Sequence, residues 1–307
     1  MSRFFSYLKK VKDNPYRILE TIFMRFPILS RNIGDKNYLK IIYRSNFNKK
    51  LDLSNPVTFN EKLQWLKLYD RKPIYTTMVD KKDAKNYVEN IIGSQYIIPA
   101  LGSWDKFDDI DFGKLPNEFV LKCTHDSGGV VVCKNKKDFD MTYAKNRINH
   151  CLKRNFYYQG REWPYKNVKP RIIAEKYISS NSQDGIRDYK FFCFNGEPKI
   201  MFVANDRMRD TDTKFDFYDM NFNHLNIKNG HPNTNGKISR PDNFDEMKKL
   251  SEKLSQGIPE ARIDFYDVDG KIYFGEITLF HWSGFVPFEP DKWDNILGSW
   301  VNLPNKK

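Results

Sequence analysis

The sequence lacks the cysteine patterns that mark disulfide frameworks, zinc sites and redox motifs. Its four cysteines form no CxxC pair and show no metal-ligand spacing; they are Cys123, Cys133, Cys151 and Cys193. We therefore expect reduced thiols in a cytosolic protein, and none of the four is a candidate nucleophile.

Signals for nucleic-acid binding and for membrane spanning are also missing. The chain has no zinc-finger spacing, RNP-like strand or helix-turn-helix pattern, so no nucleic-acid partner is expected. No apolar run approaches the ~20 residues that a helix needs to cross a bilayer. The N-terminus has no signal-peptide core or cleavage site. These absences favour a cytoplasmic location.

Positive charge and aromatic side chains are abundant. The 307 residues include 51 Lys and Arg against 39 Asp and Glu, a net charge of +12, and 15% of the residues are aromatic. Such a charge attracts anions, whether nucleic acid, an acidic membrane surface, nucleotide phosphates or an acidic glycan. The length and the 40% hydrophobic content predict a globular protein of two domains, or of one large domain with lobes.

The first thirty residues mix basic and large apolar side chains at roughly helical spacing, interrupted near Pro15. One interpretation is a pair of helices packed on the body, with Pro15 opening the second. The other is a basic amphipathic segment in peripheral contact with the inner face of an anionic membrane. The pattern alone leaves both open.

The most informative stretch is ARIDFYDVDGKIYFGEITLFHWSG at 261–284. Side chains alternate along a strand, so Arg262 and Asp264 share one face of a strand, and Glu276 and Thr278 share one face of the next. Asp269-Gly270 is a hairpin turn signal between them. The closed hairpin would bring both carboxylates to one region of one sheet face, as hard divalent cations require.

Carboxylates on a hairpin usually lie on a solvated face. Between Ile272 and Phe280, however, apolar or aromatic residues occupy both strand parities, so Glu276 has no polar face to occupy. A carboxylate in such a place needs a cation, a metal or a proton. This favours a functional interpretation of Asp264 and Glu276.

A second stretch of interest is FVLKCTHDSGGVVVC at 119–133, which predicts two buried strands joined by a small Gly-bearing turn. Successive backbone N–H groups in such a turn can bind phosphate oxygens, and Lys122 adds charge at its base. His125 is expected to be a hydrogen-bonding loop residue, because the sequence offers it no partner acid or nucleophile.

Other patterns predict the remaining elements. Thr58 and Glu61 form a capping box that opens a helix, and DAKNYVENI predicts another. Loops are expected at 94–118, helices at 137–152 and 242–256, strands at 172–178 and 215–218, and a hairpin over 188–203 around Asn195-Gly196. The aromatic, basic stretch 153–170 is a loop that either clamps an acceptor or packs structurally.

Together, PVTFNEKLQWLKLYD, VDKKDAKNYV, FVLKCTHDSGG, IIAEKYI, DYKFFCFNGEPKI and RIDFYDVDGKIYFGEIT resemble the teichuronopeptide-biosynthesis (TupA-like) family of the ATP-grasp fold, over roughly residues 50–303. The resemblance implies an α+β fold with two lobes clasping ATP. It also implies a helical N-terminal region at 1–75, a first lobe with the phosphate loop at 76–178, and a second lobe with the metal site at 179–307. The N-terminal third does not resemble the parallel α/β domain of many relatives, so the acceptor site cannot be transferred.

The resemblance also implies a nucleotide site. Lys81 and Lys122 match the phosphate-binding lysines, and Ser127, Gly128 and Gly129 match the loop that covers the phosphates. The inter-lobe hinge that takes the adenine edge would be Glu175, Lys176, Tyr177 and Ile178. Asp188 and Lys190 match a strand near the ribose and phosphates. Asp126 is unexpected inside a phosphate loop unless its side chain points outward.

The magnesium carboxylates of the family correspond to Asp264 and Glu276. Thr278 stands where many ATP-grasp proteins have Asn as a third metal ligand. Arg262 matches the arginine that steadies the transferred phosphoryl group and the later oxyanion. Backbone N–H groups around Ser283 and Gly284 are further candidate oxyanion donors.

By this resemblance the protein is an ATP- and Mg²⁺-dependent carboxylate–amine ligase that forms an acyl phosphate. Its carboxylate would be an acidic cell-surface glycan, a glycan precursor or an amino acid, and its cosubstrate an amine. One alternative is an ATP-grasp kinase with a hydroxyl acceptor. Another is a glycosyltransferase-like polysaccharide-assembly protein, although Asp210-Thr211-Asp212 is only a weak metal motif for that class.

Overall fold

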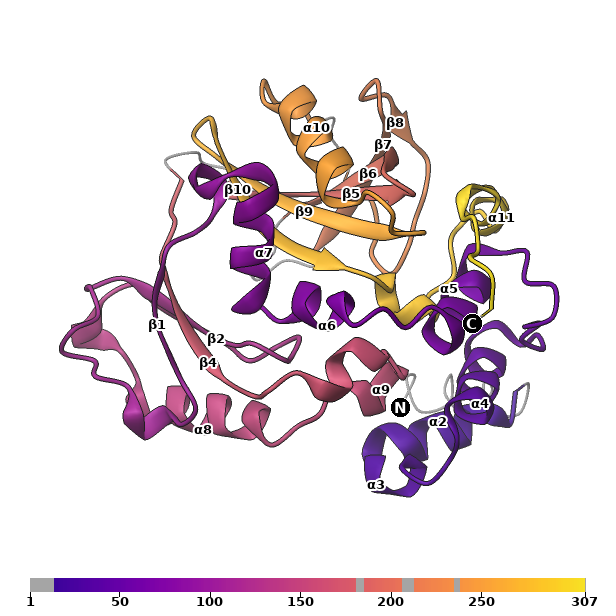
Figure 1. The fold of residues 1–307 in the computed structure, drawn as a ribbon, viewed down its shortest axis with the longest axis horizontal. Coiled ribbons are helices and arrows are strands. Elements are labelled where there is room, and N and C mark those ends of the chain that lie inside the picture. The colour runs from indigo at the N-terminus through magenta and orange to yellow at the C-terminus, as the bar shows by residue number, and fades with distance from the viewer. Residues whose placement is uncertain (1–13, 181–184, 206–212, 235–237, 307) are drawn as a thin grey trace.

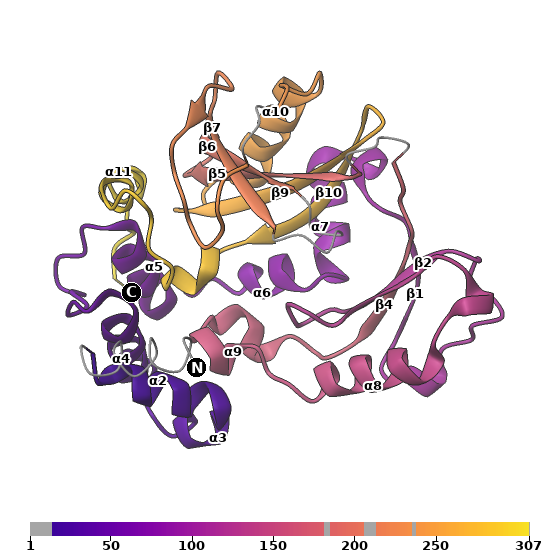
Figure 2. The same cartoon turned by 180° about the vertical axis from the view of Figure 1, so that it is seen from behind.

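Two antiparallel sheets make up the framework of the protein (Figure 1). The structure is a computed structural model that describes residues 14–180, 185–205, 213–234 and 238–306. Helices α6 (Ile74–Val79) and α7 (Asp83–Ile92) lie between the two sheets in both views (Figures 1 and 2). The predicted α+β class is confirmed.

The first sheet has four strands in the order β1-β4-β2-β3. They are β1 (Ala100–Trp104), β2 (Phe119–Cys123), β3 (Val130–Cys133) and β4 (Ile172–Lys176). Burial alternates along β2, where Phe119 and Leu121 are buried and Lys122 faces the other side. Helix α8 (Met141–Leu152) covers the buried face with Ile148, and these side chains form a hydrophobic cluster of their own.

The second sheet has six strands in the order β10-β9-β5-β6-β7-β8. They are β5 (Arg187–Phe194), β6 (Glu197–Asn205), β7 (Lys214–Asp219), β8 (His224–Leu225), β9 (Ala261–Val268) and β10 (Lys271–Thr278). Helix α10 (Phe244–Leu254) packs on it, with the rings of Phe244 and Phe191 5.8 Å apart. Strand β5 is buried on both faces because helices pack on both sides of the sheet.

Both hairpin turns predicted in this sheet are present. Asn195 and Gly196 have φ values of 53° and 91°, and Asp269 and Gly270 have φ values of 51° and 82°. Positive φ at both central residues defines the two-residue turn whose twist matches antiparallel strands, which explains the Asn-Gly and Asp-Gly pairs.

Helices form the N-terminal corner and the edges of the molecule (Figure 1). They are α2 (Tyr16–Arg25), α3 (Pro27–Ser30), α4 (Asp35–Phe47), α5 (Phe59–Tyr69), α9 (Tyr157–Gly160) and α11 (Lys292–Trp300), with short 3₁₀ helices η1 (Ser94–Tyr96), η2 (Phe107–Asp109), η3 (Lys136–Asp138), η4 (Trp163–Asn167) and η5 (His281–Gly284). The predicted capping box opens α5: Thr58 Oγ1 accepts from the N–H of Glu61, and the Glu61 carboxylate accepts from the N–H of Thr58 at 3.0 Å. Helices α2, α4, α5, α9 and α11 and the second sheet contribute buried side chains to one large hydrophobic core.

Some expectations differ from the structure. The region 94–118, expected to be loops, contains β1, which exists because its backbone pairs with β4. The stretch 153–170 contains α9 and η4 rather than a loop, and Tyr157 and Trp163 are buried, which favours structural aromatics. The expected helix at 137–152 begins only at Met141. Residues 1–13 and Asp210-Thr211-Asp212 lie outside the described residues.

All four cysteines are free, as expected, and all four are buried. Within the described ranges, no helix is long and apolar enough to cross a membrane.

Candidate active site

The β9–β10 hairpin places its charged side chains by means of a β-bulge. Phe274 pairs with Phe265, but the next paired residue of β10 is Glu276, opposite Asp264, so Gly275 is the extra residue. A Cβ at Gly275 would lie 3.1 Å from the backbone oxygen of Asp264, which favours glycine there. Plain pairing would set Glu276 opposite Ile263 on the core face. The bulge therefore brings the two carboxylates together.

The expectation that Glu276 has no polar face is wrong for the same reason. The bulge shifts the alternation, so the apolar residues before and after Gly275 lie on one core face. Glu276 lies on the opposite face among polar groups, and its side chain is 44% exposed.

Arg262 is the centre of this polar group. Its Nε donates to Asp264 Oδ1 at 2.7 Å, and one terminal nitrogen donates to Asp264 Oδ2 at 2.7 Å, to Glu276 Oε1 at 3.0 Å and to Thr278 Oγ1 at 3.0 Å. Burial alone would lower the pKa of Arg262, but Asp264 and Glu276 raise it above its ordinary value. The guanidinium is therefore charged and held in one orientation.

Strand β5 adds two more of the predicted residues to this group. Lys190 pairs with Asp264 in the sheet register, and its Nζ donates to Asp264 Oδ2 and lies 2.7 Å from Asp188 Oδ2. The three side chains are buried. Two cations thus share the oxygens of Asp264.

His281 and Asn229 belong to the same group, and sequence reasoning missed both. His281 Nδ1 lies 2.8 Å from a terminal nitrogen of Arg262, and Nε2 lies 2.7 Å from Asn229 Oδ1. Burial, with the nearby charges of Arg262 and Lys190, lowers the pKa of His281 well below its ordinary value. The neutral ring accepts from Arg262 and donates to Asn229, which orients the guanidinium.

A left-handed turn follows the hairpin. Trp282, Ser283 and Gly284 have φ values of 49°, 53° and 62°. A Cβ at Gly284 would lie 2.4 Å from Gln64 Nε2 and 3.0 Å from Leu63 Cβ, which together with the positive φ favours glycine there. Two consecutive non-glycine residues in this region are strained and persist only where their surroundings hold them.

A buried polar group from α5 and η4 holds that turn, and sequence reasoning missed it too. Lys67 is fully buried, and its Nζ donates to Ser283 O and Gly160 O at 2.7 Å each and to Gln64 Oε1 at 3.0 Å. Glu162 accepts from Ser283 Oγ. Burial lowers the pKa of Lys67 to about 7, an effect that the nearby charge of Glu162 opposes.

The other predicted residues gather on the first sheet. Lys122 Nζ lies 2.5 Å from Glu175 Oε2, and Lys85 Nζ lies 2.6 Å from Glu175 Oε1. Burial tends to raise the pKa of Glu175, but the two lysines outweigh it and lower the pKa. Lys85 was not predicted, although it follows Lys81 by one helical turn. The structure places the Glu175 carboxylate between two cations, while its adenine role stays a prediction.

The loop between β2 and β3 is anchored from three sides. Lys81 Nζ donates to Asp126 O at 2.8 Å, and Arg147 donates to Gly128 O at 2.7 Å. Gly129 packs closely, since a Cβ there would lie 2.8 Å from Cys123 Sγ. Ser127 at the tip is exposed. The loop thus presents its tip while its base is fixed.

Asp126 turns away from the loop tip. Its carboxylate is buried, lies 3.1 Å from Arg154 and accepts from the N–H of Ser127 at 2.8 Å. His125 is buried beside it, with Nε2 3.2 Å from the carbonyl oxygens of Cys151 and Arg154. His125 is therefore a hydrogen-bonding loop residue, as expected.

The predicted residues thus form two groups, one on each sheet. Burial raises the pKa of Tyr165 in η4 well above its ordinary value, and the charges of Glu162, Glu276 and Asp126 raise it further. Lys176 ends β4, and Tyr177 and Ile178 follow it where the chain crosses from the first sheet to the second (Figure 1).

The polar group on β9 and β10 fits a hard cation. Oxygens of Asp264, Glu276 and Thr278 all lie within 3.0 Å of one nitrogen of Arg262. The three oxygens thus surround one position that a positively charged group occupies. In the described part of the chain, no set of three His, Cys, Asp or Glu side chains is arranged to hold a metal by itself. Mg²⁺ suits such a partial set because it binds one or two carboxylates and takes its other ligands from phosphates and water.

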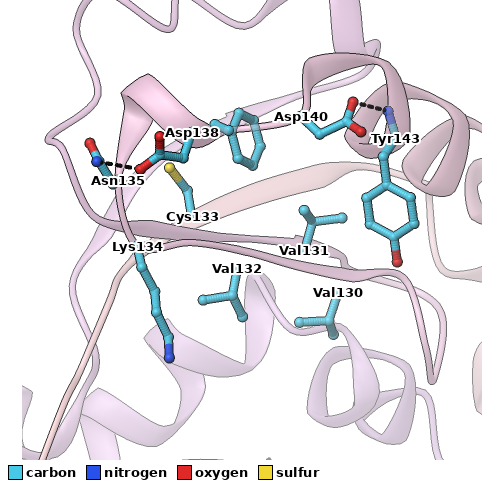
Figure 3. A pocket seen from close by; sticks show the side chains of 10 residues that line it. Val130, Val131, Val132, Cys133, Lys134, Asn135, Asp138, Asp140 and Tyr143 are labelled. Carbon is cyan, nitrogen blue, oxygen red and sulfur yellow. Dashed lines mark hydrogen bonds between the residues drawn. The ribbon is translucent and has the colours of Figure 1, made fainter.

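A hollow of about 430 Å³ lies elsewhere, on the edge strand of the first sheet (Figure 3). Val130, Val132 and Tyr143 line it, and its polar groups pair with each other, Asn135 Nδ2 with Asp138 at 2.6 Å and Asp140 with the N–H of Tyr143 at 2.8 Å. No residue of the predicted nucleotide or metal site lines it.

Solved structures with a similar fold include several ligases. D-alanine–D-alanine ligase from Bacillus anthracis complexed with ATP is 17% identical, with a TM-score of 0.39, over 66% of this chain and 55% of that chain. D-alanine–D-alanine ligase from Helicobacter pylori is 17% identical, with a TM-score of 0.42, over 80% of this chain and 69% of that chain. The ATP-grasp ligase PsnB complexed with a minimal precursor is 9% identical, with a TM-score of 0.40, over 67% and 53%. This chain thus spans 53–69% of their lengths.

No curated protein sequence matches the chain. Residues 61–302, more than three quarters of it, match the family described as TupA-like ATPgrasp. The match confirms the family and the ATP-grasp fold predicted from the motifs. The chain belongs to the TupA-like ATP-grasp family.

Proposed function

We propose that the protein is an ATP-dependent carboxylate–amine ligase. The observation that supports this most strongly is the convergence of Asp264, Glu276 and Thr278 oxygens on one nitrogen of Arg262, next to the strained turn at 282–284. Phosphoryl transfer depends on fixed positive charge and oriented donors of this kind.

ATP lies between the two sheets in this proposal. Lys81 and Lys122 contact its phosphates, the tip of the loop at Ser127–Gly129 covers them, and residues 175–178 contact the adenine. Lys85 is added to the set because it shares Glu175 with Lys122. Glu175 keeps the two lysine side chains in place and limits their mutual repulsion.

Mg²⁺ is the second cofactor, held by Asp264 and Glu276 with Thr278 as a further oxygen donor. When bound, it supplies charge neutralisation to the β- and γ-phosphate oxygens. Arg262 and Lys190 pair with Asp264, and with Mg²⁺ bound they would share its oxygens with the metal and neutralise charge on the phosphoryl group. His281 keeps the Arg262 guanidinium oriented throughout.

The reaction has two steps. A substrate carboxylate oxygen attacks the γ-phosphorus, the bond to the β–γ bridging oxygen breaks, and ADP leaves an acyl phosphate behind. An amine then attacks the acyl carbon, and the tetrahedral intermediate expels phosphate to leave an amide. Arg262 and the N–H of Gly284 stabilise the oxyanion. The N–H of Ser283 already donates to Phe280 O at 2.8 Å and is left out of this role.

The carboxylate substrate in this proposal is an acidic cell-surface glycan or its precursor, and the cosubstrate is an amine or amino acid. The net charge of +12 supports an acidic acceptor. The activity belongs to the assembly of cell-envelope or capsular polysaccharide on the cytoplasmic side of the membrane.

Phosphorus NMR of the purified protein with Mg·ATP and a metabolite extract tests the reaction type. We expect ADP and phosphate, with a hydroxamate when hydroxylamine is added, because hydroxylamine traps an acyl phosphate. A new phosphate ester without hydroxamate would mean a kinase instead. No ATP turnover together with no binding of Mg·ATP would favour a non-catalytic assembly protein.

A further inference from the structure

The corner formed by α2 and α3 carries large apolar side chains in the open. Among the described residues, six large hydrophobic side chains are more than half exposed, and four of these six lie in residues 24–29. They are Met24 at 52%, Phe26 at 55%, Ile28 at 66% and Leu29 at 57%, and we call them the α2–α3 patch. Contiguous exposed apolar groups of this size mark an interaction surface.

The patch is held firmly on the body. On the other face of α2, Phe23 is buried and stacks on Tyr38 of α4, with ring centroids 5.8 Å apart. The end of α3 is tied down by Arg161, which donates to Ser30 O and Ile33 O. Helices α2 and α3 therefore pack on the body and still present an apolar face, and contact of this segment with a membrane stays a prediction.

The segment that carries the patch is strongly basic. Residues 14–50 contain eight Lys and Arg but only Glu20 and Asp35 as acids, a net charge of +6. Both acids are engaged, Glu20 with Asn46 at 2.8 Å and Asp35 with Arg71 at 2.8 Å. Arg25 lies within the patch in the sequence, Arg31 follows it, and both are exposed.

A basic hollow lies at the same corner. It has a volume of about 580 Å³, and Lys40, Arg44 and Lys50 line it together with Tyr16, Ile33 and Leu51. No described carboxylate pairs with any of these three cations. Three cations beside an apolar surface match a phosphate headgroup with its acyl chains.

We propose that this corner docks the protein on an anionic phospholipid membrane. The α2–α3 patch enters the boundary between headgroups and acyl chains, and Lys40, Arg44 and Lys50 bind lipid phosphates. A second copy of the chain is a poorer occupant, because a symmetric dimer would set two surfaces of +6 against each other. The proposal does not depend on the ligase reaction.

Vesicle flotation with the full chain tests it, without nucleotide. We expect binding to phosphatidylglycerol vesicles, weakened by salt, and little binding to phosphatidylcholine vesicles. Phe26→Ser with Ile28→Ser should weaken binding about tenfold or more, through lost apolar burial. Lys40→Glu with Lys50→Glu should weaken it about tenfold or more as well, through lost attraction to the surface.

Matched controls use exposed side chains elsewhere: Leu101→Ser with Met141→Ser for the patch, and Lys253→Glu with Lys292→Glu for the hollow. Both should bind like the wild type, and all variants should keep its melting temperature. Equal binding of patch variants and wild type, equal binding to neutral vesicles, or no binding to phosphatidylglycerol would overturn the proposal. So would a wild-type dimer, seen by light scattering, that the patch variant dissolves.

Discussion

The Nζ atom of Lys67 lies 2.7 Å from the carbonyl oxygen of Ser283, a residue in left-handed conformation 216 positions further along the chain. Burial lowers the pKa of Lys67 to about 7 from 10.5. At pH values between about 7 and 10.5, the Lys67 side chain is protonated in the unfolded chain but has lost its proton in the folded chain. Stability contributed by this group therefore rises with pH over that interval.

The Lys67→Met variant should lack this rise. We expect the free energy of unfolding of the wild type, measured relative to the variant, to increase between about pH 7 and about pH 9.5. Urea unfolding at several pH values measures it. Lys253→Met, at an exposed position, should follow the wild type. Parallel curves for the wild type and Lys67→Met would contradict the buried, shifted lysine.

Glu276→Gln should remove a carboxylate charge that, in our proposal, helps to hold Mg²⁺ at the phosphates. We expect turnover, measured as ADP release, to fall about 100-fold or more. The fold should be unaffected because the side chain is half-exposed. Glu197→Gln, at an exposed position on β6, should keep full turnover. Near-normal activity of the Glu276 variant would refute the metal assignment.

Glu175→Gln should destabilise the first sheet, because it leaves Lys85 and Lys122 close together without their shared anion. Removing one partner of such a buried group costs about 3 kcal/mol. Because the two lysines lower the pKa of Glu175, its contribution is present at neutral pH and is lost on acidification through that lowered pKa.

Urea unfolding of Glu175→Gln at neutral and acidic pH checks both statements. The difference from the wild type should shrink as the pH falls. Glu197→Gln, whose partner Lys199 lies at the surface, should change stability little at either pH. A constant difference at all pH values would mean that the carboxylate is not ionised between its lysines.

Gly129→Ala should strain the base of the loop between β2 and β3, which we propose covers the phosphates. Its Cβ would lie 2.8 Å from Cys123 Sγ and 2.9 Å from Cys151 Cβ, an overlap that costs about 1–3 kcal/mol. We expect a lower melting temperature and a smaller stabilisation by Mg·ATP in thermal-shift measurements. Gly34→Ala, with open space around its Cβ, is the control. An unchanged response to Mg·ATP would exclude the loop from the nucleotide site.

The sequence contained enough to predict the fold and most of the second-sheet group. Turn residues at Asn195-Gly196 and Asp269-Gly270 set the hairpins, and the capping box at Thr58 set the start of α5. The bulge also had a signal. The buried residues change from even to odd positions across Gly275, from Ile272 and Phe274 to Ile277 and Leu279. From the sequence alone, the same pattern is equally consistent with a strand that has two apolar faces.

Long-range contacts could not be predicted in this way. Lys67 lies in α5 next to Leu63, Trp65 and Leu66, a pattern that predicts only a packed helix face. Its hydrogen-bond partners Gly160 and Ser283 are far away in the sequence. Strand β1 has little alternation of its own and forms because β4 offers it hydrogen bonds.

In the described part of the chain, the buried hydrophobic side chains form two separate cores of unequal size, and we expect this division to affect how cooperatively the chain unfolds. The smaller core supports Lys122 and the phosphate loop, while the larger one supports Arg262 and Asp264. We therefore expect the smaller core to melt at a lower temperature than the larger one. A nucleotide held as we propose contacts residues on both, so its binding joins two independent melting units into one.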